Sequence, residues 1–500
     1  MNASAALLSP FRAARSLWSW VASRWRRLLA LFVTTMHVLG ALLSVHAVMS
    51  TRTPQGAVAW VVSLNTFPYV AVPAYLVFGH SKFDGYELLR HRDYLAKSES
   101  ESIAMKALRE GGMVFEPASE ETELRARLLE RLALLPLTRG NDVDLLIDGD
   151  ATFDAIEASI RSAEDYVLFQ FYILRADGLG RRLKDALLDR AAAGVRCYVM
   201  YDQVGSASLD RGYVKELRDG GVKTASFRTT QGFRNRFRIN FRNHRKIVVV
   251  DGREAFVGGH NVGDEYLGLD PKIGPFRDTH VAIRGPVVLP IQVSFVEDWS
   301  WTTGEVPTLD WIPRRAPEGD AVAACVPTGP ADELETMTLV FLDMLQNARS
   351  RVWIATPYFV PDAQVVSALQ IAALRGVDVR VIVPDQNDSR LVDLTSYSYL
   401  EELDRAGVRM FRYEPGFMHQ KVMLVDDVAS IGTANFDNRS MRLNFEVSMI
   451  LHEEDLIRDV VKMLEADLAR SRSFEVTEYT ERGIPFRAAV RLARLLAPVL

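Results

Sequence analysis

Two copies of one short pattern carry the residues best suited to chemistry in this chain. The pattern H-x-K-x-x-x-x-D occurs at His244, Lys246 and Asp251, and again at His419, Lys421 and Asp426. Each copy begins an apolar, β-branched run, and a Gly-rich turn ending in Asn follows it. A single copy would arise by chance in roughly one chain in a hundred of this length. Two copies at matching places predict one site built from two halves.

Paired histidines and lysines suit phosphoryl-group chemistry without a metal. Residues two apart on a strand share a face, so each histidine lies on the same face as its lysine. The lysines would hold the non-bridging oxygens of a phosphodiester and neutralise the charge that develops in the transition state. One neutral imidazole would attack phosphorus and form a phospho-histidine. The other, protonated, would give its proton to the leaving alkoxide.

Four further polar residues occupy matching places in the two halves. Asn261 ends the turn GGHN and Asn435 ends the turn GTAN, where each would donate hydrogen bonds to phosphate oxygens. Asp278 and Glu446 are equivalent carboxylates, and either could accept the Nδ1 proton of a histidine and fix its tautomer. These residues are therefore candidates for binding the substrate phosphate or orienting the histidines.

The flanks of the two patterns match as well, which indicates an internal duplication. YVLFQFYIL (166–174) corresponds to RVWIATPYF (351–359), and RDTHVAIRG (277–285) corresponds to NFEVSMIL (444–451). In both halves apolar strand patterns alternate with helical patterns, which predicts an α/β sandwich with largely parallel sheets. We expect the halves to pack about a pseudo-twofold axis, with the catalytic loops at the seam.

Composition excludes several classes of protein. With 48% hydrophobic residues the chain can bury large cores, and its net charge of −5 argues against a generally basic nucleic-acid binder. Cys197 and Cys325 are the only cysteines, which gives neither a disulfide framework nor a metal-ligand set. The basic run at 233–246 could be a solvated loop or an RNA-contacting surface. We interpret it as a contact for anionic lipid headgroups.

The N-terminus contains two apolar stretches, 28–49 and 57–78, each long enough to cross a bilayer. Basic residues gather at the outer ends of this pair, which places both ends in the cytoplasm. They are Arg12, Arg15, Arg24, Arg26 and Arg27 before it, and Lys82, Arg90 and Arg92 after it. The alternative interpretation of the first stretch is a cleaved signal peptide. We favour a transmembrane hairpin because the second stretch follows so closely.

The organisation expected along the chain has seven parts. These are a cytoplasmic basic N-terminus (1–27), two transmembrane helices (28–79), a connector (80–140), the first repeat (141–301), a Pro- and Gly-rich linker (302–334), the second repeat (335–455) and a C-terminal helical tail (456–500). The end of the tail alternates Arg with apolar residues. It would either lie on a membrane surface as an amphipathic helix or dock on the catalytic unit.

The duplicated pattern resembles the mark of the phospholipase D superfamily, over residues 140–450 or so. Looser patterns in the N-terminal hairpin, in LLPLTRGNDVDLLIDGDATFDAI and in the C-terminal RLLAPVL are similar to bacterial cardiolipin synthases. The resemblance implies two phospholipase D-like α/β repeats behind a membrane hairpin in the inner membrane, with the catalytic part on the cytoplasmic side. It implies transfer of a phosphatidyl group from one phosphatidylglycerol to another, with release of glycerol and no metal or other cofactor. Phosphatidylethanolamine could serve as donor instead, and no nucleic-acid partner is expected.

The resemblance also assigns roles to the motif residues. It makes His244 the nucleophile and His419 the acid and base, although the near-symmetry of the repeats does not separate them. Asp251 and Asp426 belong to the motif but face away from the histidines if the strand continues, so we interpret them as structural. The turn GGHN departs from the family, which more often has Ser or Thr in second place, and it adds His260.

Alternatives to a transferase remain at this stage. A phospholipase D that transfers to water would use the same residues, and a nucleic-acid phosphodiesterase shares the motif. The two apolar stretches and the negative charge speak against the latter. A membrane-tethered binding scaffold would require at least one broken motif, and both copies are intact.

Overall fold

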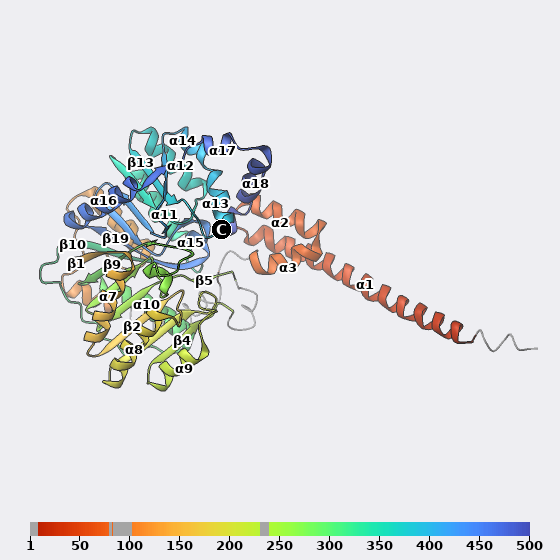
Figure 1. Cartoon of the computed structure of the whole chain (residues 1–500), viewed down its shortest axis with the longest axis horizontal. Coiled ribbons are helices and arrows are strands. Elements are labelled where there is room, and N and C mark those ends of the chain that lie inside the picture. Colours follow the sequence, from red (N-terminus) through yellow and green to blue (C-terminus); the bar gives the residue numbers. More distant parts are fainter. Residues whose placement is uncertain (1–8, 80–82, 84–102, 231–239) are drawn as a thin grey trace, which may run out of the picture. The chain divides into compact units, whose positions relative to one another are not determined.

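The computed structural model describes residues 9–79, 83, 103–230 and 240–500. These residues belong to two compact units (Figure 1): the N-terminal helices (residues 9–79) and an α/β body that contains both copies of the H-x-K pattern. Half of the basic run at 233–246 lies outside the described residues, so its lipid contact stays a prediction.

The N-terminal helices are α1 (Ser9–Ser50), α2 (Pro54–Thr66) and α3 (Pro68–Phe78). Within α1, Arg24–Ser50 is long and apolar enough to cross a membrane, and no other described helix is. The expected second span is interrupted at Phe67, which leaves the helical region (φ −131°, ψ 56°). Pro68 disfavours helical geometry at the residue before it. The second apolar stretch therefore forms two shorter helices, and its crossing of a membrane stays a prediction.

Helices α2 and α3 pack against α1 within this unit (Figure 1). Gly40 of α1 allows a close approach, since a Cβ there would lie 2.2 Å from the carbonyl oxygen of Leu64. Nδ1 of His46 lies 2.7 Å from the hydroxyl of the buried Tyr75. This contact satisfies a polar group inside an apolar helix pair.

The α/β body contains many short strands, which form two sets, one in each half. Those of the first half are β1 (Thr138–Ile147), β2 (Tyr166–Phe171), β3 (Arg196–Asp202), β4 (Lys223–Phe227), β5 (Arg242–Asn243), β6 (Ile247–Val250), β7 (Glu254–Gly258), β8 (Phe276–Arg277) and β9 (Thr279–Arg284). Those of the second half are β10 (Ala321–Thr328), β11 (Arg351–Ala355), β12 (Phe359–Val360), β13 (Asp378–Pro384), β14 (Arg409–Tyr413), β15 (Phe417–Met418), β16 (Val422–Val425), β17 (Val428–Gly432), β18 (Phe436–Asp437), β19 (Asn444–His452) and β20 (Ser471–Ser473).

One sheet runs through the body, and its strand order repeats outward from a central seam. The first half has the order β1-β9-β7-β6-β2-β3-β4, and the second has β10-β19-β17-β16-β11-β13-β14 with β20 at its edge. Antiparallel pairing of β1 with β10 joins the halves, with Thr138 opposite Ala323. The repeated order confirms the internal duplication predicted from the sequence.

The prediction of largely parallel sheets is wrong for the strands nearest the seam. Only β2-β3-β4 and β11-β13-β14 are parallel among the long strands of each half. Strand β6 pairs antiparallel with β2 and with β7, and β16 does the same with β11 and β17. A tight turn joins β6 to β7, and so short a link cannot make the crossover that parallel neighbours need.

Helices flank the sheet of the body (Figure 1), and strands such as β2 are buried along their whole length. Burial on both faces is typical of a layered α/β fold. The helices are α6 (Glu120–Ala133), α7 (Asp148–Ser162), α8 (Gly178–Ala192), α9 (Arg211–Asp219), α10 (Val288–Thr303), α11 (Thr336–Asn347), α12 (Ala363–Leu374), α13 (Arg390–Tyr397), α14 (Leu400–Asp404), α15 (Asn438–Arg442), α16 (Glu454–Ala469), α17 (Thr477–Thr480) and α18 (Ile484–Arg494), with 3₁₀ turns η2 (Asp264–Leu267) and η3 (Ala497–Val499).

The structure corrects the prediction for the segment 302–334 and decides between the two alternatives for the C-terminal tail. The segment 302–334 is not wholly a linker, because its apolar run AVAACVPT forms β10 at the seam. Of the two alternatives for the tail, the structure has the docked helix. Val490 of α18 is buried, and Arg491 and Arg494 form ion pairs of 2.9 and 2.7 Å with Glu401 and Glu402 of α14.

Candidate active site

Each motif histidine is held in place by the opposite half of the molecule. His244 follows β5, which pairs with β19 of the second half, and its backbone N–H donates to the carbonyl of Phe445 at 2.9 Å. His419 follows β15, which pairs with β8 of the first half, and its backbone N–H donates to the carbonyl of Arg277 at 2.7 Å. Both histidines are therefore at the seam between the repeats.

The carboxylates that face the histidines are exchanged between the halves in the same way. Nδ1 of His244 lies 2.9 Å from Oε2 of Glu446, which belongs to the second repeat. Nδ1 of His419 lies 2.7 Å from Oδ2 of Asp278, which belongs to the first. A neutral ring that donates from Nδ1 keeps its lone pair on Nε2. In both histidines Nε2 is thus the nitrogen left to act on a substrate.

Burial favours the neutral form of both imidazoles. It lowers the pKa of His244 to about 4, against the opposing effect of Glu446. Burial also lowers the pKa of His419 well below its usual value, and the charges of Lys421 and Lys246 add to this. The anionic phosphate of a substrate would favour protonation. One ring can then act as an acid once the substrate is bound.

The motif lysines are buried beside their histidines. Nζ of Lys246 donates to the carbonyl of His244 at 2.7 Å, and Nζ of Lys421 donates to the carbonyl of His419. Burial lowers the pKa of both amines, that of Lys421 to about 8. Two cations forced into an apolar interior gain most from an anionic partner, so the pair is suited to a phosphate.

The two orienting carboxylates differ in their surroundings. Glu446 accepts hydrogen bonds from Oγ1 of Thr433 (2.6 Å), Oγ of Ser440 (2.9 Å) and Nδ2 of Asn444 (3.1 Å). Burial raises its pKa, but the interactions with His244, Lys246 and Thr433 together outweigh burial and the net shift is downward. Beyond its histidine, Asp278 accepts the backbone N–H of Thr279 (2.8 Å), and burial raises its pKa. Glu446 is the better-stabilised anion.

The glycine in second place of the turn GGHN, where the family more often has Ser or Thr, has a steric cause. A Cβ at Gly259 would lie 2.0 Å from Oδ1 of Asp278, so the shorter carboxylate occupies the space that the side chain of Thr433 has in the second half. His260 lies in the core, with Nδ1 at 3.1 Å from Nδ1 of His280, and burial lowers its pKa to about 3. His260 is thus a neutral packing residue behind Asp278.

The turn asparagines have unequal environments. Oδ1 of Asn261 accepts the backbone N–H of Ile173 (3.0 Å), and its Nδ2 donates to the hydroxyl of Tyr266 (2.8 Å). Oδ1 of Asn435 is buried and has no hydrogen-bond partner among the described residues. Asn261 therefore shapes the wall of the site, and its role as a phosphate donor remains a prediction for both residues.

The motif aspartates are not brought to the histidines. Both lie in the turns after β6 and β16 with φ of 51°. The carboxylate of Asp251 accepts backbone N–H groups from Glu164, Asp165 and Tyr166 at 2.7–2.8 Å. Asp426 binds the equivalent backbone of residues 349–351 at 2.8–3.0 Å. Each anchors the start of a central strand, which matches their interpretation as structural.

Sequence reasoning did not find the residues between each histidine and lysine. Arg245 forms a buried ion pair of 3.0 Å with Asp298 of α10, and its Nε donates to the carbonyl of Glu446 (3.0 Å). In the equivalent place, Nε2 of Gln420 donates to Asp467 of α16 at 2.7 Å. The alternation of the strand could have shown that these positions face away from the histidines into the core.

Aromatic rings also went unpredicted. The ring of Tyr172 contacts His244 edge to face at 5.0 Å, and Lys246 lies 5.5 Å from its centre. Around His419, the rings of Phe276 and Phe417 lie at 5.4 and 5.8 Å. These rings cover part of each imidazole, and no spacing in the sequence distinguishes them from other core aromatics.

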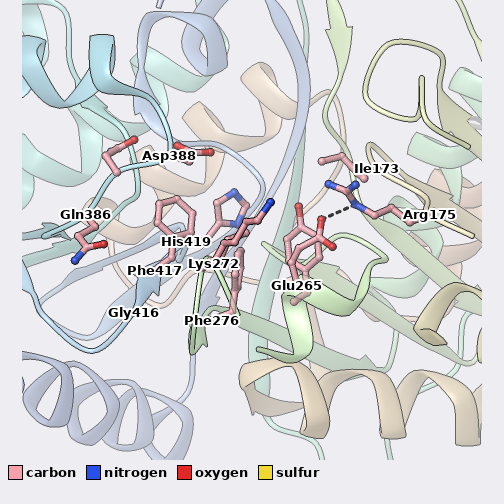
Figure 2. A pocket seen from close by; sticks show the side chains of 13 residues that line it. Ile173, Arg175, Glu265, Lys272, Phe276, Gln386, Asp388, Gly416, Phe417 and His419 are labelled. Atoms are coloured by element: carbon pink, nitrogen blue, oxygen red, sulfur yellow. Dashed lines mark hydrogen bonds and ion pairs between the residues drawn. The ribbon is translucent and has the colours of Figure 1, made fainter. Parts of the chain in front are cut away.

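A cavity of about 270 Å³ opens beside His419 (Figure 2). We call it the His419 cavity. One wall comes from the first half and includes Arg175, Glu265 and Lys272. The other comes from the second half. Its remaining lining residues are Ile173, Tyr266, Ile273, Phe276, Gln386, Asn387, Asp388, Gly416 and Phe417.

Comparisons with known proteins agree with this geometry. The profile of the family described as cardiolipin synthase, PLD-like domain, matches residues 156–272 and 341–468, one segment in each half. Cardiolipin synthase A of Pseudomonas fluorescens (strain SBW25) is 47% identical over 479 residues, which covers 95% of this chain and 98% of that protein. Cardiolipin synthase A of Pseudomonas entomophila (strain L48) is 46% identical over 469 residues, 93% of this chain and 97% of that protein.

A solved structure shares the fold. The crystal structure of phosphatidylserine synthase from Haemophilus influenzae Rd KW20 superposes with a TM-score of 0.58 and 16% sequence identity, covering 75% of this chain and all of that one. With two matched repeats and near full-length relatives, the chain belongs to the cardiolipin synthase family of phospholipase D-like proteins.

Proposed function

We propose that this protein makes cardiolipin by transferring a phosphatidyl group from one phosphatidylglycerol to another, with release of glycerol. The observation that carries the proposal is the pair of buried histidines, each with a facing carboxylate and a neighbouring lysine, at the seam of the two repeats. Two neutral imidazoles and two cations in one buried site are suited to double displacement at a phosphodiester.

In the first half-reaction, Nε2 of His244 attacks the phosphorus of the donor lipid. The bond from phosphorus to the glycerol oxygen breaks, and protonated His419 gives that oxygen its proton. Lys246 and Lys421 neutralise the non-bridging oxygens. We assign the attack to His244 because its partner Glu446 is the better-stabilised anion, and such a partner stabilises the positive charge that the ring acquires.

In the second half-reaction, neutral His419 takes a proton from the primary hydroxyl of the acceptor headgroup. The acceptor oxygen attacks phosphorus, and the bond from phosphorus to Nε2 of His244 breaks. Cardiolipin leaves and both histidines return to their starting states. If water replaced the acceptor alcohol, the same steps would yield phosphatidate, so the partial cover of the imidazoles by the surrounding rings favours transfer.

The N-terminal helices supply the membrane attachment that lipid substrates require. We propose that α1 crosses the inner membrane, that α2 and α3 return the chain, and that the α/β body works on the cytoplasmic side. Supporting this are the 27-residue apolar stretch Arg24–Ser50 and the basic residues at the outer ends of the hairpin.

The test uses the purified full-length protein in phosphatidylglycerol vesicles with EDTA, followed by analysis of the lipids formed. We expect cardiolipin and free glycerol in equal amounts, and neither from His244→Ala or His419→Ala. Phosphatidate without cardiolipin would indicate a hydrolase. No conversion would contradict the proposed donor, and vesicles with phosphatidylethanolamine would then test the other lipid.

A further inference from the structure

We propose that the His419 cavity is the binding site for the headgroup of the acceptor lipid, and that Lys272 contacts the phosphate of that lipid. This inference rests on the proposed transferase function, and it names the part of the site that distinguishes a lipid acceptor from water or free glycerol.

The position of the cavity follows from the proton transfers. His419 lines the cavity, whereas His244 does not. Because His419 exchanges protons with the glycerol oxygens, the leaving and the entering hydroxyl must both lie on its side of the phosphorus. The cavity is the described hollow that His419 lines, so it is where the acceptor hydroxyl arrives (Figure 2).

The lining of the cavity suits a glycerol headgroup. Gln386 and Asp388 supply polar groups at one side, and Asp388 is held by the hydroxyl of Tyr358 at 2.8 and 2.9 Å. The rings of Phe276 and Phe417 form an apolar surface for the glycerol carbons. Polar groups placed beside an apolar surface can orient a small ligand.

Two cations belong to the wall from the first half, and they differ in how far they are already neutralised. Arg175 pairs with Glu265 at 2.6 Å (Figure 2). Lys272 has no carboxylate within ion-pair distance among the residues that the structure describes, and it is exposed to solvent. An uncompensated ammonium at the rim of a polar cavity attracts an anion. The diester phosphate of the acceptor lipid is the anion that a bound headgroup would bring there.

The volume of the His419 cavity limits how much of the acceptor lipid it can hold. About 270 Å³ is near the lower limit of ligand pockets, so it accommodates a glycerol phosphate and leaves no room for two acyl chains. The acyl chains of the acceptor would therefore remain outside the cavity. Lys272 would recognise the charge that a lipid acceptor has and that water and free glycerol lack.

The experiment compares two acceptors in the same full-length protein. Cardiolipin formation from phosphatidylglycerol uses the anionic lipid acceptor, and exchange of labelled glycerol into phosphatidylglycerol uses a neutral one. For Lys272→Ala we expect cardiolipin formation to fall roughly tenfold, as for the loss of one charge-assisted contact, with glycerol exchange changed less than twofold. Lys272→Arg should retain most cardiolipin formation. Lys462→Ala removes an exposed lysine of α16 and serves as the matched control.

Two outcomes would overturn the inference. Equal losses in both assays would mean that Lys272 serves the donor or the fold, and unchanged cardiolipin formation would mean that it does not contact the acceptor. Failure of the proposed function is distinguishable, because the unmodified protein would then form no cardiolipin.

Discussion

The two histidines of the candidate active site differ most in the carboxylate behind each. Three side chains besides His244 donate hydrogen bonds to Glu446, whereas Asp278 accepts one backbone N–H besides the bond with His419. A carboxylate that is already satisfied stays ionised and stabilises the imidazolium in front of it. This inequality is the basis on which we propose different roles for two histidines that the sequence presents as near equivalents.

Replacing Glu446 should disable His244 without unfolding the protein. In Glu446→Gln the side chain keeps its size but loses the charge that stabilises the imidazolium and fixes its tautomer, so we expect turnover to fall roughly 10³-fold. The rate of cardiolipin formation in phosphatidylglycerol vesicles measures this. Glu454→Gln alters an exposed carboxylate of α16 and should have no effect. Activity of Glu446→Gln within tenfold of the unmodified protein would refute the role of Glu446.

The fall in activity at alkaline pH should follow the deprotonation of Lys421. Burial lowers the pKa of Lys421 to about 8, so its ammonium is present below that pH and is lost as the pH rises through it. Because kcat/KM follows the free enzyme, we expect it to fall above about pH 8. In Lys421→Arg the guanidinium stays charged, and the alkaline fall should move to higher pH even if the rate at pH 7 is reduced. Identical alkaline limbs in both proteins would contradict this assignment.

At the scale of residues, the sequence predicted most of the candidate site but not which carboxylate faces which histidine. Spacing alone placed His244 beside Lys246, and it identified Asp278 and Glu446 as orienting candidates. It could not show that each carboxylate serves the histidine of the other repeat. Local periodicity states which face a side chain is on, whereas the exchange depends on pairing between segments far apart in the chain.

At the scale of elements, the motif aspartates connect a turn to the strand beside it. The carboxylate of Asp251 binds three consecutive backbone N–H groups at the start of β2, and Asp426 does the same for β11. Such bonds tie the β6–β7 turn to its neighbour and so fix the register of the strand that follows His244. Each motif therefore combines a histidine and a lysine suited to phosphoryl chemistry with an aspartate that holds the neighbouring strand in place.

Removing Asp251 should cost stability before it costs chemistry. We expect Asp251→Ala to lower the free energy of unfolding by about 2–4 kcal/mol, since buried N–H groups lose a charged acceptor. The thermal unfolding midpoint of the full-length protein in detergent measures this. Asp426 is less buried, so Asp426→Ala should lower the midpoint less, and the exposed Asp427 offers the matched control. An unchanged midpoint in Asp251→Ala would contradict the anchoring role.

The sequence predicted the alternation of strands and helices better than their directions. Apolar runs such as IVVV in β6 have the same composition in parallel and antiparallel sheets, so composition does not determine direction. The tight turn after β6 was the available signal. Likewise, the break at Phe67 follows from Pro68, a signal present in the sequence.

At the scale of the whole molecule, the lipid substrates and product of the proposed reaction stay in a bilayer, and the chain should stay with them. We expect the protein to remain in the membrane pellet after alkaline carbonate extraction, because Arg24–Ser50 has the length and apolar character of a spanning helix. A fluorescent reporter fused after Leu500 should be active in the cytoplasm, and alkaline phosphatase fused there should be inactive. Extraction into the supernatant, or an active phosphatase, would contradict this topology.

The strand exchange at the seam also bears on how such a chain could have arisen. Either repeat by itself carries a histidine and a carboxylate that cannot serve one another, since β5 requires β19 and β15 requires β8. A polypeptide of one repeat could build this site only as a symmetric dimer whose two identical patches contact each other. Gene duplication and fusion would then free the two sides to diverge, and the pairs Gly259 with Asp278 and Thr433 with Glu446 are such a divergence.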